Sequence, residues 1–526
     1  MKTRKALLLP LLAAAAAVAV PAAVHLGYLR LEVPRQHWFY FLPRGPRPGM
    51  IWPMLAVALM LGLLWAALRW RGKVEPWKVL AAAVVCCYLC AVGTRASTKM
   101  GFTTLASTVL FDGSNSYFTT ATETPDPLAL ARDYPAQMPR LRLHAATQSP
   151  GTFLLHAALR RFFLNCPSCM ALAEVLLWLN PCHRASEVTT LVNPVWGSHF
   201  QPPEVLAALL IALLFPLILA LGVIPTFALA RRLGGERPAL VIVALYAVTP
   251  SFIWFTAAVD QIYPTIAALT LLLVHCGVRH RTQWLPLVGA GLLTGLAIFA
   301  SYGYSVIARA AALFIALLTS FGCRAGARTP PAVLRESKAA GYKPPATLTS
   351  LRPTVRVAVQ LGLYGAGVAL VLAIIQFGLG IDLVGVARVS GELRTRLYLH
   401  DLPRPWLTWV LLNPIEFTLG LGFSTAALVI AALVVRRSRR DPALVLLSAT
   451  LVALALLDLS GAARAEWSRM LMMAMPLCLI GAGGAVRRLR LYQPAPAVIL
   501  IASQAVYALV CFQLFEVWGA WIVPFD

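Results

Sequence analysis

Long apolar segments separated by short polar ones recur from one end of the chain to the other. Each is long enough, at roughly 20 residues, to cross a hydrocarbon layer as a helix. No short segments of alternating polarity, as a membrane β-barrel requires, are evident. The pattern predicts an all-α polytopic membrane protein with about thirteen transmembrane helices, at 6–28, 50–69, 77–93, 204–230, 238–256, 261–278, 284–301, 302–320, 357–379, 419–435, 442–459, 469–486 and 495–515.

Composition supports this class. Hydrophobic residues make up 59% of the 526 residues and charged residues only 13%, whereas about 25% of a typical soluble domain is charged. The net charge of +24 would suggest a nucleic-acid partner, but the Lys and Arg residues cluster in the short connectors between apolar segments. Such clustering is typical of cytoplasmic loops, so we expect no nucleic-acid partner.

The basic connectors also predict an orientation. With the N-terminus in the cytoplasm, the connectors RWRGKVEPWK, ARRLGGER, RHRTQ, RRSRR and RRLRLYQ all fall inside, as does the long basic segment 321–356. The C-terminus then lies outside. The alternative for the first segment, after MKTRK, is a cleaved signal peptide. A retained helix is preferred because the later segments then alternate consistently between the two sides of the membrane. The abundant Ala, Leu and Arg are typical of a GC-rich bacterial genome, so we expect the bacterial inner membrane.

This topology divides the chain into five parts and places one large polar segment outside. Residues 151–165 and 168–180 within that segment are amphipathic or too short to span, which is typical of interfacial helices. Segment 321–356 is rich in Pro, Ala and Thr and is expected to be a flexible linker. The parts are three N-terminal helices (1–93), the external segment with the candidate active site (94–203), helices four to eight (204–320), the linker (321–356) and helices nine to thirteen (357–526).

Three of the ten cysteines lie in the external segment. Two of Cys166, Cys169 and Cys182 could form a disulfide if this segment faces an oxidising compartment. A zinc site with His183 is the alternative, but no fourth ligand is evident. The other seven lie in or beside apolar segments, where cysteine usually acts as a small hydrophobic residue.

Two acidic residues stand out in a chain poor in acids. Asp112, in FDGSNSY, follows an apolar segment and precedes a turn, so it could act as a general base at the membrane boundary; the alternative is an ordinary turn-starting aspartate. Asp260 lies in FTAAVDQIYP, at the external end of a helical hairpin. Acids at membrane helices are costly and tend to serve a site, although a simple loop carboxylate remains the alternative.

The segment GAARAEWSRMLMMAMP supplies cationic candidates. Arg464 and Arg469 lie outside, against the usual charge bias, and the planar guanidinium fork binds phosphate well. A lipid phosphate is therefore a natural partner. The alternative is a local pair between Glu466 and Arg469, three residues apart.

Together these features resemble the GT-C superfamily of membrane glycosyltransferases, in particular its bacterial protein-mannosyltransferase-like and aminoarabinose-transferase-like branch. Asp112 stands where that family has its catalytic base, and HAATQSPGTFLLHAALRRF lies where members often carry a His-Pro-Pro-Gly type motif. ARRLGG followed by an acidic hairpin, and ARAEWSRMLMMAMP, resemble later family elements. Gln148 and Ser149 replace the usual His and Pro, and two additional helices precede the Asp112 segment.

The resemblance implies sugar transfer, with inversion, from a polyprenyl-phosphate donor to an acceptor hydroxyl on the external face. It implies that Asp112 is the base, that Arg469 and then Arg464 stabilise the leaving phosphate, and that the remaining candidates bind or orient the substrates: Tyr117, His144, Gln148, Asp260 and Glu466. It leaves the sugar and the acceptor (protein, lipid or glycan) open. No cofactor is expected: there is no glycine-rich phosphate loop, and although some GT-C enzymes use a divalent metal, no residues here have convincing ligand spacing.

Three other functions fit parts of the pattern. A lipid-linked glycan polymerase or ligase would rely on external residues such as Arg394, Arg396, His400 and Arg404. A secondary transporter would require broken or charged helices within the membrane, whereas the expected spans are mostly uninterrupted, with their ionisable residues at the ends. A non-catalytic scaffold is the third alternative.

Overall fold

The computed structural model of the protein is entirely helical over the residues that it describes, and no strand occurs among them. These residues are 2–26, 28–29, 50–70, 73–98, 100–178, 184–279, 284–321, 352–401, 403–435 and 441–514. Cys182, His183 and nearly all of the expected linker 321–356 lie outside them.

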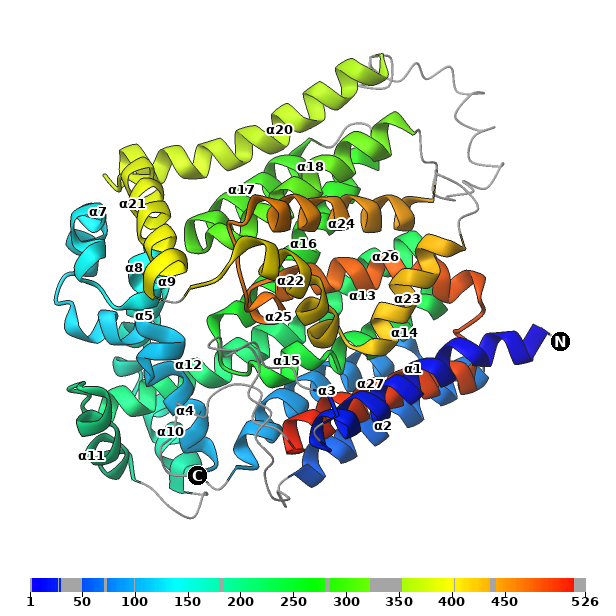
Figure 1. The fold of residues 1–526 in the computed structure, drawn as a ribbon, viewed down its shortest axis with the longest axis horizontal. Coiled ribbons are helices and arrows are strands. Elements are labelled where there is room, and N and C mark those ends of the chain that lie inside the picture. The colour runs from blue at the N-terminus through cyan, green and yellow to red at the C-terminus, as the bar shows by residue number, and fades with distance from the viewer. Residues whose placement is uncertain are drawn as a thin grey trace.

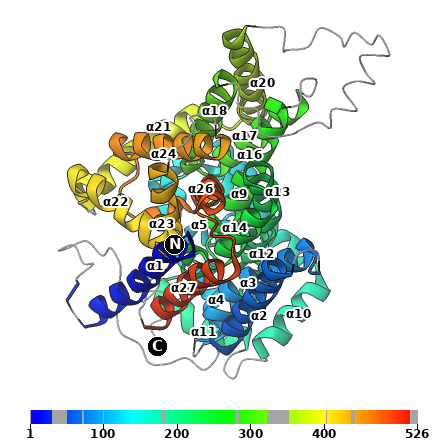
Figure 2. The same ribbon diagram turned by 90° about the vertical axis from the view of Figure 1, so that its right-hand side faces the viewer.

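Ten helices in this part of the chain are long and apolar enough to cross a membrane, or eleven if one bent pair counts as a span. The chain is therefore a multi-pass membrane protein. Their axes run side by side in Figure 1, with α20 at one margin and α1, α2 and α27 at the other, as Figure 2 also shows. The helices that form the ten spans are α1 (Lys2–His25), α2 (Ile51–Arg69), α3 (Pro76–Ala96), α12 (Pro202–Leu221) with α13 (Val223–Gly234), α14 (Glu236–Ala247) with α15 (Pro250–Trp254), η3 (Val259–Ile262) with α16 (Tyr263–Arg279), η4 (Tyr302–Tyr304) with α18 (Ser305–Ser320), α20 (Pro353–Ala373) with the π-helix η6 (Ile374–Gly378), α24 (Pro442–Ser460) and α27 (Pro494–Leu514).

The expected count of about thirteen differs at three places. The helix α17 (Leu285–Ala300) is apolar but short. The expected helix 419–435 is α23 (Phe423–Val434), which bends by 113° from α22 (Trp406–Leu421). The expected helix 469–486 is divided into α25 (Trp467–Met470), η8 (Met472–Ala474) and α26 (Met475–Arg488).

Short helices from the expected external segment gather at one end of the bundle, at the left of Figure 1. Amphipathic stretches 151–165 and 168–180 form α9 and α10 there, close to their expected bounds. The polar α21, whose first turn is capped by Asp382, crosses the same end. The helices are α4 (Phe102–Leu110), α5 (Asp112–Glu123), α6 (Pro127–Arg132), α7 (Tyr134–Gln137), η2 (Met138–Arg140), α8 (Leu143–Thr147), α9 (Pro150–Leu164), α10 (Pro167–Trp178), α11 (Ala185–Trp196), α21 (Leu383–Arg396) and the π-helix η7 (Leu397–Asp401).

Different polar features lie at the two ends of the helix bundle. Cys166 and Cys169 form a disulfide at the start of α10, which is one of the pairings that the sequence allowed. At the opposite end, Asp441 caps α24 through the Ala443 amide (3.1 Å) and forms ion pairs with Arg487 and Arg488 at the end of α26. The basic ends of α13, α16 and α26 thus lie away from the short helices.

Candidate functional site

A cavity of about 310 Å³ opens where the short helices meet the ends of the spans. Its walls come from α5, α8, α9, α16, α18, α21, α24 and α25. Charged and hydroxylated side chains make up much of its lining, which comprises Tyr117, His144, Thr147, Gln148, Thr152, Val259, Asp260, Tyr263, Ser301, Tyr302, Gly303, Ser305, Arg309, Arg394, Leu397, Tyr398, Arg404, Leu457, Ala462, Ala463, Glu466, Arg469, Met470 and Leu471.

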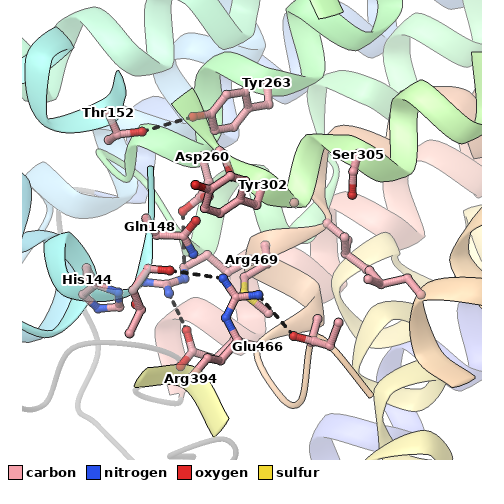
Figure 3. A pocket seen from close by; sticks show the side chains of 18 of the residues that line it. His144, Gln148, Thr152, Asp260, Tyr263, Tyr302, Ser305, Arg394, Glu466 and Arg469 are labelled. Atoms are coloured by element: carbon pink, nitrogen blue, oxygen red, sulfur yellow. Dashed lines mark hydrogen bonds and ion pairs between the residues drawn. The ribbon is translucent and has the colours of Figure 1, made fainter. Parts of the chain in front are cut away.

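Arg469 is the central cation of this cavity. It is only 7% exposed, its Nη2 lies 2.5 Å from Oε2 of Glu466, and its Nε lies 3.9 Å from Oδ2 of Asp260. Figure 3 shows these three side chains converging on one space. A buried guanidinium needs charged partners, and here they come from residues more than 200 positions apart in the chain.

The backbone that presents these residues is strained. Ala465 and Glu466 adopt positive φ angles of 68° and 58°, and Ala257 one of 70°, conformations that non-glycine residues rarely adopt. Buried amides hold both turns: Asn413 accepts from the Ala465 amide (3.1 Å) and Gln261 from the Ala257 amide (2.9 Å). Strain of this kind that persists around a cavity is typical of functional sites.

A second arginine reinforces Glu466. Arg404 places its Nη2 3.5 Å from Oε1 of Glu466 and donates to the Arg464 carbonyl (2.8 Å). Arg464 does not line the cavity. Its guanidinium donates to the carbonyls of Arg404 (2.7 Å) and Gly461 (3.1 Å), and its role as a phosphate ligand stays a prediction.

Glu466 is ionised throughout the physiological pH range. Burial alone raises its pKa, but Arg469 and Arg404 outweigh that effect and lower the pKa from 4.5 to about 2. The pKa of His144 is lowered by burial and by Arg469, which favours neutral imidazole. The cavity therefore holds fixed ionic charges beside a histidine whose neutral form is favoured.

Three of the predicted binding residues, Tyr117, His144 and Gln148, line the same cavity. His144 Nε2 donates to the carbonyl of Gly113 (2.9 Å), and burial, together with Asp260, raises the pKa of Tyr117 well above its usual value. Gln148 lines the cavity with a buried Oε1 that has no hydrogen-bond partner among the described residues. An orphaned buried acceptor is costly, and a hydroxyl of a ligand would satisfy it.

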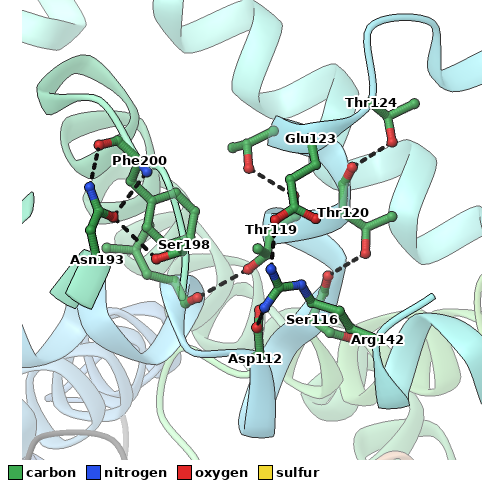
Figure 4. Close-up of polar contacts among 12 residues, drawn as sticks. Asp112, Ser116, Thr119, Thr120, Glu123, Thr124, Arg142, Asn193, Ser198 and Phe200 are labelled. Atoms are coloured by element: carbon green, nitrogen blue, oxygen red, sulfur yellow. Dashed lines mark hydrogen bonds and ion pairs between the residues drawn. The ribbon is translucent and has the colours of Figure 1, made fainter. Parts of the chain in front are cut away.

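Asp112 lies beside this site but not among its lining residues. It begins α5 and forms an ion pair with Arg142, which also binds Glu123 (2.6 Å), as Figure 4 shows. Its Oδ1 is buried without a hydrogen-bond partner in the described structure. The next residue, Gly113, contacts His144, so the carboxylate is close to the cavity while its charge is matched by Arg142.

Sequence reasoning missed three arginines of the cavity, Arg309, Arg394 and Arg404, in their present roles. Arg394, proposed for the ligase alternative, donates to the Thr147 carbonyl (3.1 Å) and faces the cavity with Arg404, whereas Arg396 and His400 line a separate shallow hollow. Arg309 was not considered, although a charge inside SYGYSVIARAAALFIALL is itself a signal. The expectation that ionisable residues occupy only span ends was therefore wrong for α18.

No metal site emerges from the described residues: nowhere among them do three or more His, Cys, Asp or Glu side chains form a group that could hold an ion.

No family model and no curated protein matches the sequence. Among solved structures, the Archaeoglobus fulgidus oligosaccharyltransferase complex with Zn and sulfate aligns at 15% identity over 83% of this chain and 54% of that chain, with a TM-score of 0.36.

Two further structures of an oligosaccharyltransferase from the same organism align in the same way. One, named AglB, is in complex with an inhibitory peptide and a dolichol-phosphate (14% identity, 84% and 56% coverage, TM-score 0.37). The other is tethered to an acceptor peptide containing the NVT sequon (15%, 84% and 56%, 0.35). The chain spans about half the length of these proteins, and similarity this low carries no argument about its fold or function.

Proposed function

We propose that the chain is a GT-C-type membrane glycosyltransferase that moves a sugar from a polyprenyl-phosphate donor to an acceptor hydroxyl on the external face of the membrane. The observation that carries this proposal is the cavity itself: carboxylates and guanidinium groups from distant segments meet where membrane spans end. Such a place suits a substrate whose lipid tail lies in the bilayer and whose sugar lies in water.

The charges fit the two demands of this reaction. The acceptor hydroxyl loses a proton to a carboxylate as its oxygen attacks the anomeric carbon, and the leaving phosphate takes the bonding electrons. The positive charge of Arg469 stabilises that phosphate, while the ion pair with Glu466 holds the guanidinium of Arg469 in place. Gln148 and Tyr117 supply hydrogen-bonding groups for the sugar or the acceptor.

Two carboxylates are candidates for the base. Asp260 lines the cavity beside Arg469, and we propose it as the base on that ground. Asp112, to which the sequence resemblance assigns the role, is paired with Arg142 and would have to exchange that partner for the acceptor. It remains the second candidate.

A sugar-transfer assay with purified protein in proteoliposomes tests both the proposed reaction and the proposed base. A panel of polyprenyl-phosphate sugars serves as donors and membrane extract as acceptor. We expect Asp260→Asn to abolish transfer and Arg142→Gln to leave it within about threefold, because Arg142 does not line the cavity and its ion pair is partly exposed, so that it contributes little. Loss of transfer in Asp112→Asn with retention in Asp260→Asn would return the base to Asp112.

A transporter is the second candidate, because two observations favour it: the break between α22 and α23 and the charge within α18. The same preparation separates the two functions. Absence of turnover with every lipid-linked donor, together with saturable binding of a soluble solute, would replace the transferase proposal.

A further inference from the structure

The helix α22 carries one acidic side chain, Glu416, that is buried but does not line the cavity. It lies in the apolar stretch WLTWVLLNPIEFTLGL and is only 2% exposed. A buried carboxylate is costly unless it is hydrogen-bonded or paired, and charged groups within apolar membrane helices usually serve a site. Any role of Glu416 in the cavity must therefore act through another residue.

Glu416 binds the residue that precedes Arg469. Its Oε1 accepts hydrogen bonds from the hydroxyl (3.0 Å) and the backbone amide (3.4 Å) of Ser468. Ser468 is completely buried, and the next residue carries the guanidinium at the centre of the cavity. The carboxylate therefore fixes the backbone of α25 one position before Arg469.

The same face of α22 contacts this segment at two further points. Asn413 and Gly420 lie on that face, three positions before Glu416 and four positions after it. Asn413 accepts from the amide of Ala465 (3.1 Å), which has a positive φ. At Gly420 an added Cβ would lie 2.6 Å from the Cβ of Ser468. The helices α22 and α25 pack against each other, and their ribbons lie together in Figure 1.

We propose that Glu416 is a positioning residue that holds Arg469 at the cavity through Ser468. The hydrogen bonds of Ser468 fix the turn from which Arg469 projects, and the close packing at Gly420 leaves no room for that turn to shift toward α22. The role of Glu416 in catalysis rests on the proposed function, because it matters only if Arg469 acts on the substrate. The positioning itself does not depend on the reaction and can be measured without it.

Modification of arginine by phenylglyoxal, located by peptide mass spectrometry on the purified protein in detergent, measures how often Arg469 becomes accessible. Arg95 is the internal reference for unfolding of the whole protein. It is also 7% exposed, but it belongs to α3 and donates to the Trp254 carbonyl (2.9 Å). A change confined to α25 should alter the rate at Arg469 and leave the rate at Arg95 unchanged.

Three variants isolate the hydrogen bonds of Glu416. Glu416→Ala removes both bonds to Ser468, and Glu416→Gln keeps an oxygen that can accept them. Thr418→Ala is the matched control on α22, because it also removes a polar group, and the hydroxyl of Thr418 donates to the Pro414 carbonyl of the same helix (2.7 Å).

We expect Glu416→Ala to raise the modification rate of Arg469 about fivefold or more relative to that of Arg95, as for loss of a buried hydrogen bond that opposes local opening. Glu416→Gln and Thr418→Ala should both stay within about twofold of the wild type. In the sugar-transfer assay, Glu416→Ala should lower kcat about fivefold or more and change the donor KM less than about twofold, because Arg469 acts on the leaving group in the transition state.

An unchanged rate at Arg469 in Glu416→Ala would overturn the proposal. A rise that Arg95 shares would also overturn it, because the carboxylate would then merely stabilise the whole fold. Equally raised rates in the Ala and Gln variants would show that the hydrogen bonds do not hold the turn. Wild-type kcat in Glu416→Ala despite faster modification would overturn the role in catalysis. Absence of transfer in the wild type would reject the proposed function alone, and the modification rates would still decide the positioning.

Discussion

At the scale of single residues, Arg469 and its two carboxylates form one ionic group, and we propose that this group serves both the stability of the fold and the transfer reaction. Removing one member of a buried ionic group leaves the others uncompensated, which costs more than the group contributes as a whole. Variants of this ionic group should therefore lose stability and transfer activity to different extents, and the two losses can be measured separately.

We expect Arg469→Gln to lower the free energy of unfolding by about 2 kcal/mol or more, because Asp260 then loses its ion-pair partner and Glu466 keeps only Arg404. The double variant Arg469→Gln/Glu466→Gln should recover part of that stability but none of the transfer activity. Thermal melting and sugar transfer measure the two effects. Recovery of activity in the double variant would contradict the assignment of Arg469 to the phosphate.

The low pKa of Glu466 predicts a pH dependence with a definite sign. Since the pKa is lower in the folded state, the ion pair contributes its full stabilisation above about pH 4.5, the ordinary value, and loses it as the pH falls toward 2. The change in stability is small, because the side chain of Glu466 is 39% exposed. Glu466→Gln should flatten this part of a plot of melting temperature against pH. A stability change in that variant confined to pH 6–8 would contradict the assignment.

At the scale of elements, the break between α22 and α23 depends on one glycine. Gly422 has a φ of 90°, and a Cβ there would lie 2.8 Å from the side-chain amide of Gln504, which accepts from the Thr425 amide at the start of α23 (3.1 Å). The conformation and the close approach both exclude other residues.

Gly422→Ala should therefore lower the free energy of unfolding by about 1–3 kcal/mol. Gly362→Ala is the matched control: nothing lies within 4 Å of its added Cβ, and it lies inside α20, where alanine is favoured by up to about 1 kcal/mol. Thermal melting in one detergent compares the two. Equal melting temperatures for both variants would show that the break tolerates a side chain.

The elements also show what sequence patterns can and cannot predict. Apolar length predicted α2, α3, α16 and α24 to within a few residues, because hydrophobic transfer dominates their placement. It did not predict the bend at Gly422, since the apolar content continues through 423–434. Only the left-handed backbone and the Gln504 contact, 82 residues further on, produce the break.

The same contrast holds for the site. Asp260, Glu466 and Arg469 stood out because charges are rare in this chain, and the structure brings all three together. Asp112 was equally conspicuous, but its partner Arg142 belongs to a separate short helix region, and no local pattern reveals a contact across 30 positions. Pairing of distant charges is a property of the fold.

At the scale of the whole molecule, the two ends of the bundle differ in kind. The short helices, with the cavity that they help to line, occupy one end, and the basic ends of α13, α16 and α26 occupy the other. We propose that the cavity end is external, as the charge bias predicts.

Cysteine labelling in intact cells tests this orientation. Pro125→Cys lies at the cavity end and Glu236→Cys at the basic end, and both positions are exposed. A membrane-impermeant maleimide should label the first variant without permeabilisation and the second only after it, relative to the wild-type background. The reverse pattern would invert the topology and place the proposed reaction in the cytoplasm.

The disulfide at the start of α10 has a practical consequence for producing the protein. Cys166 and Cys169 are three positions apart, and the Met170 amide already donates to the Cys166 carbonyl (3.0 Å), so the bond joins residues that the helix has brought together. Chain-entropy arguments give a bridge over so short a loop only about 2 kcal/mol. Recombinant hosts that lack disulfide-forming machinery should therefore yield folded, membrane-inserted protein, and mild reductants in purification buffers should leave the bundle intact.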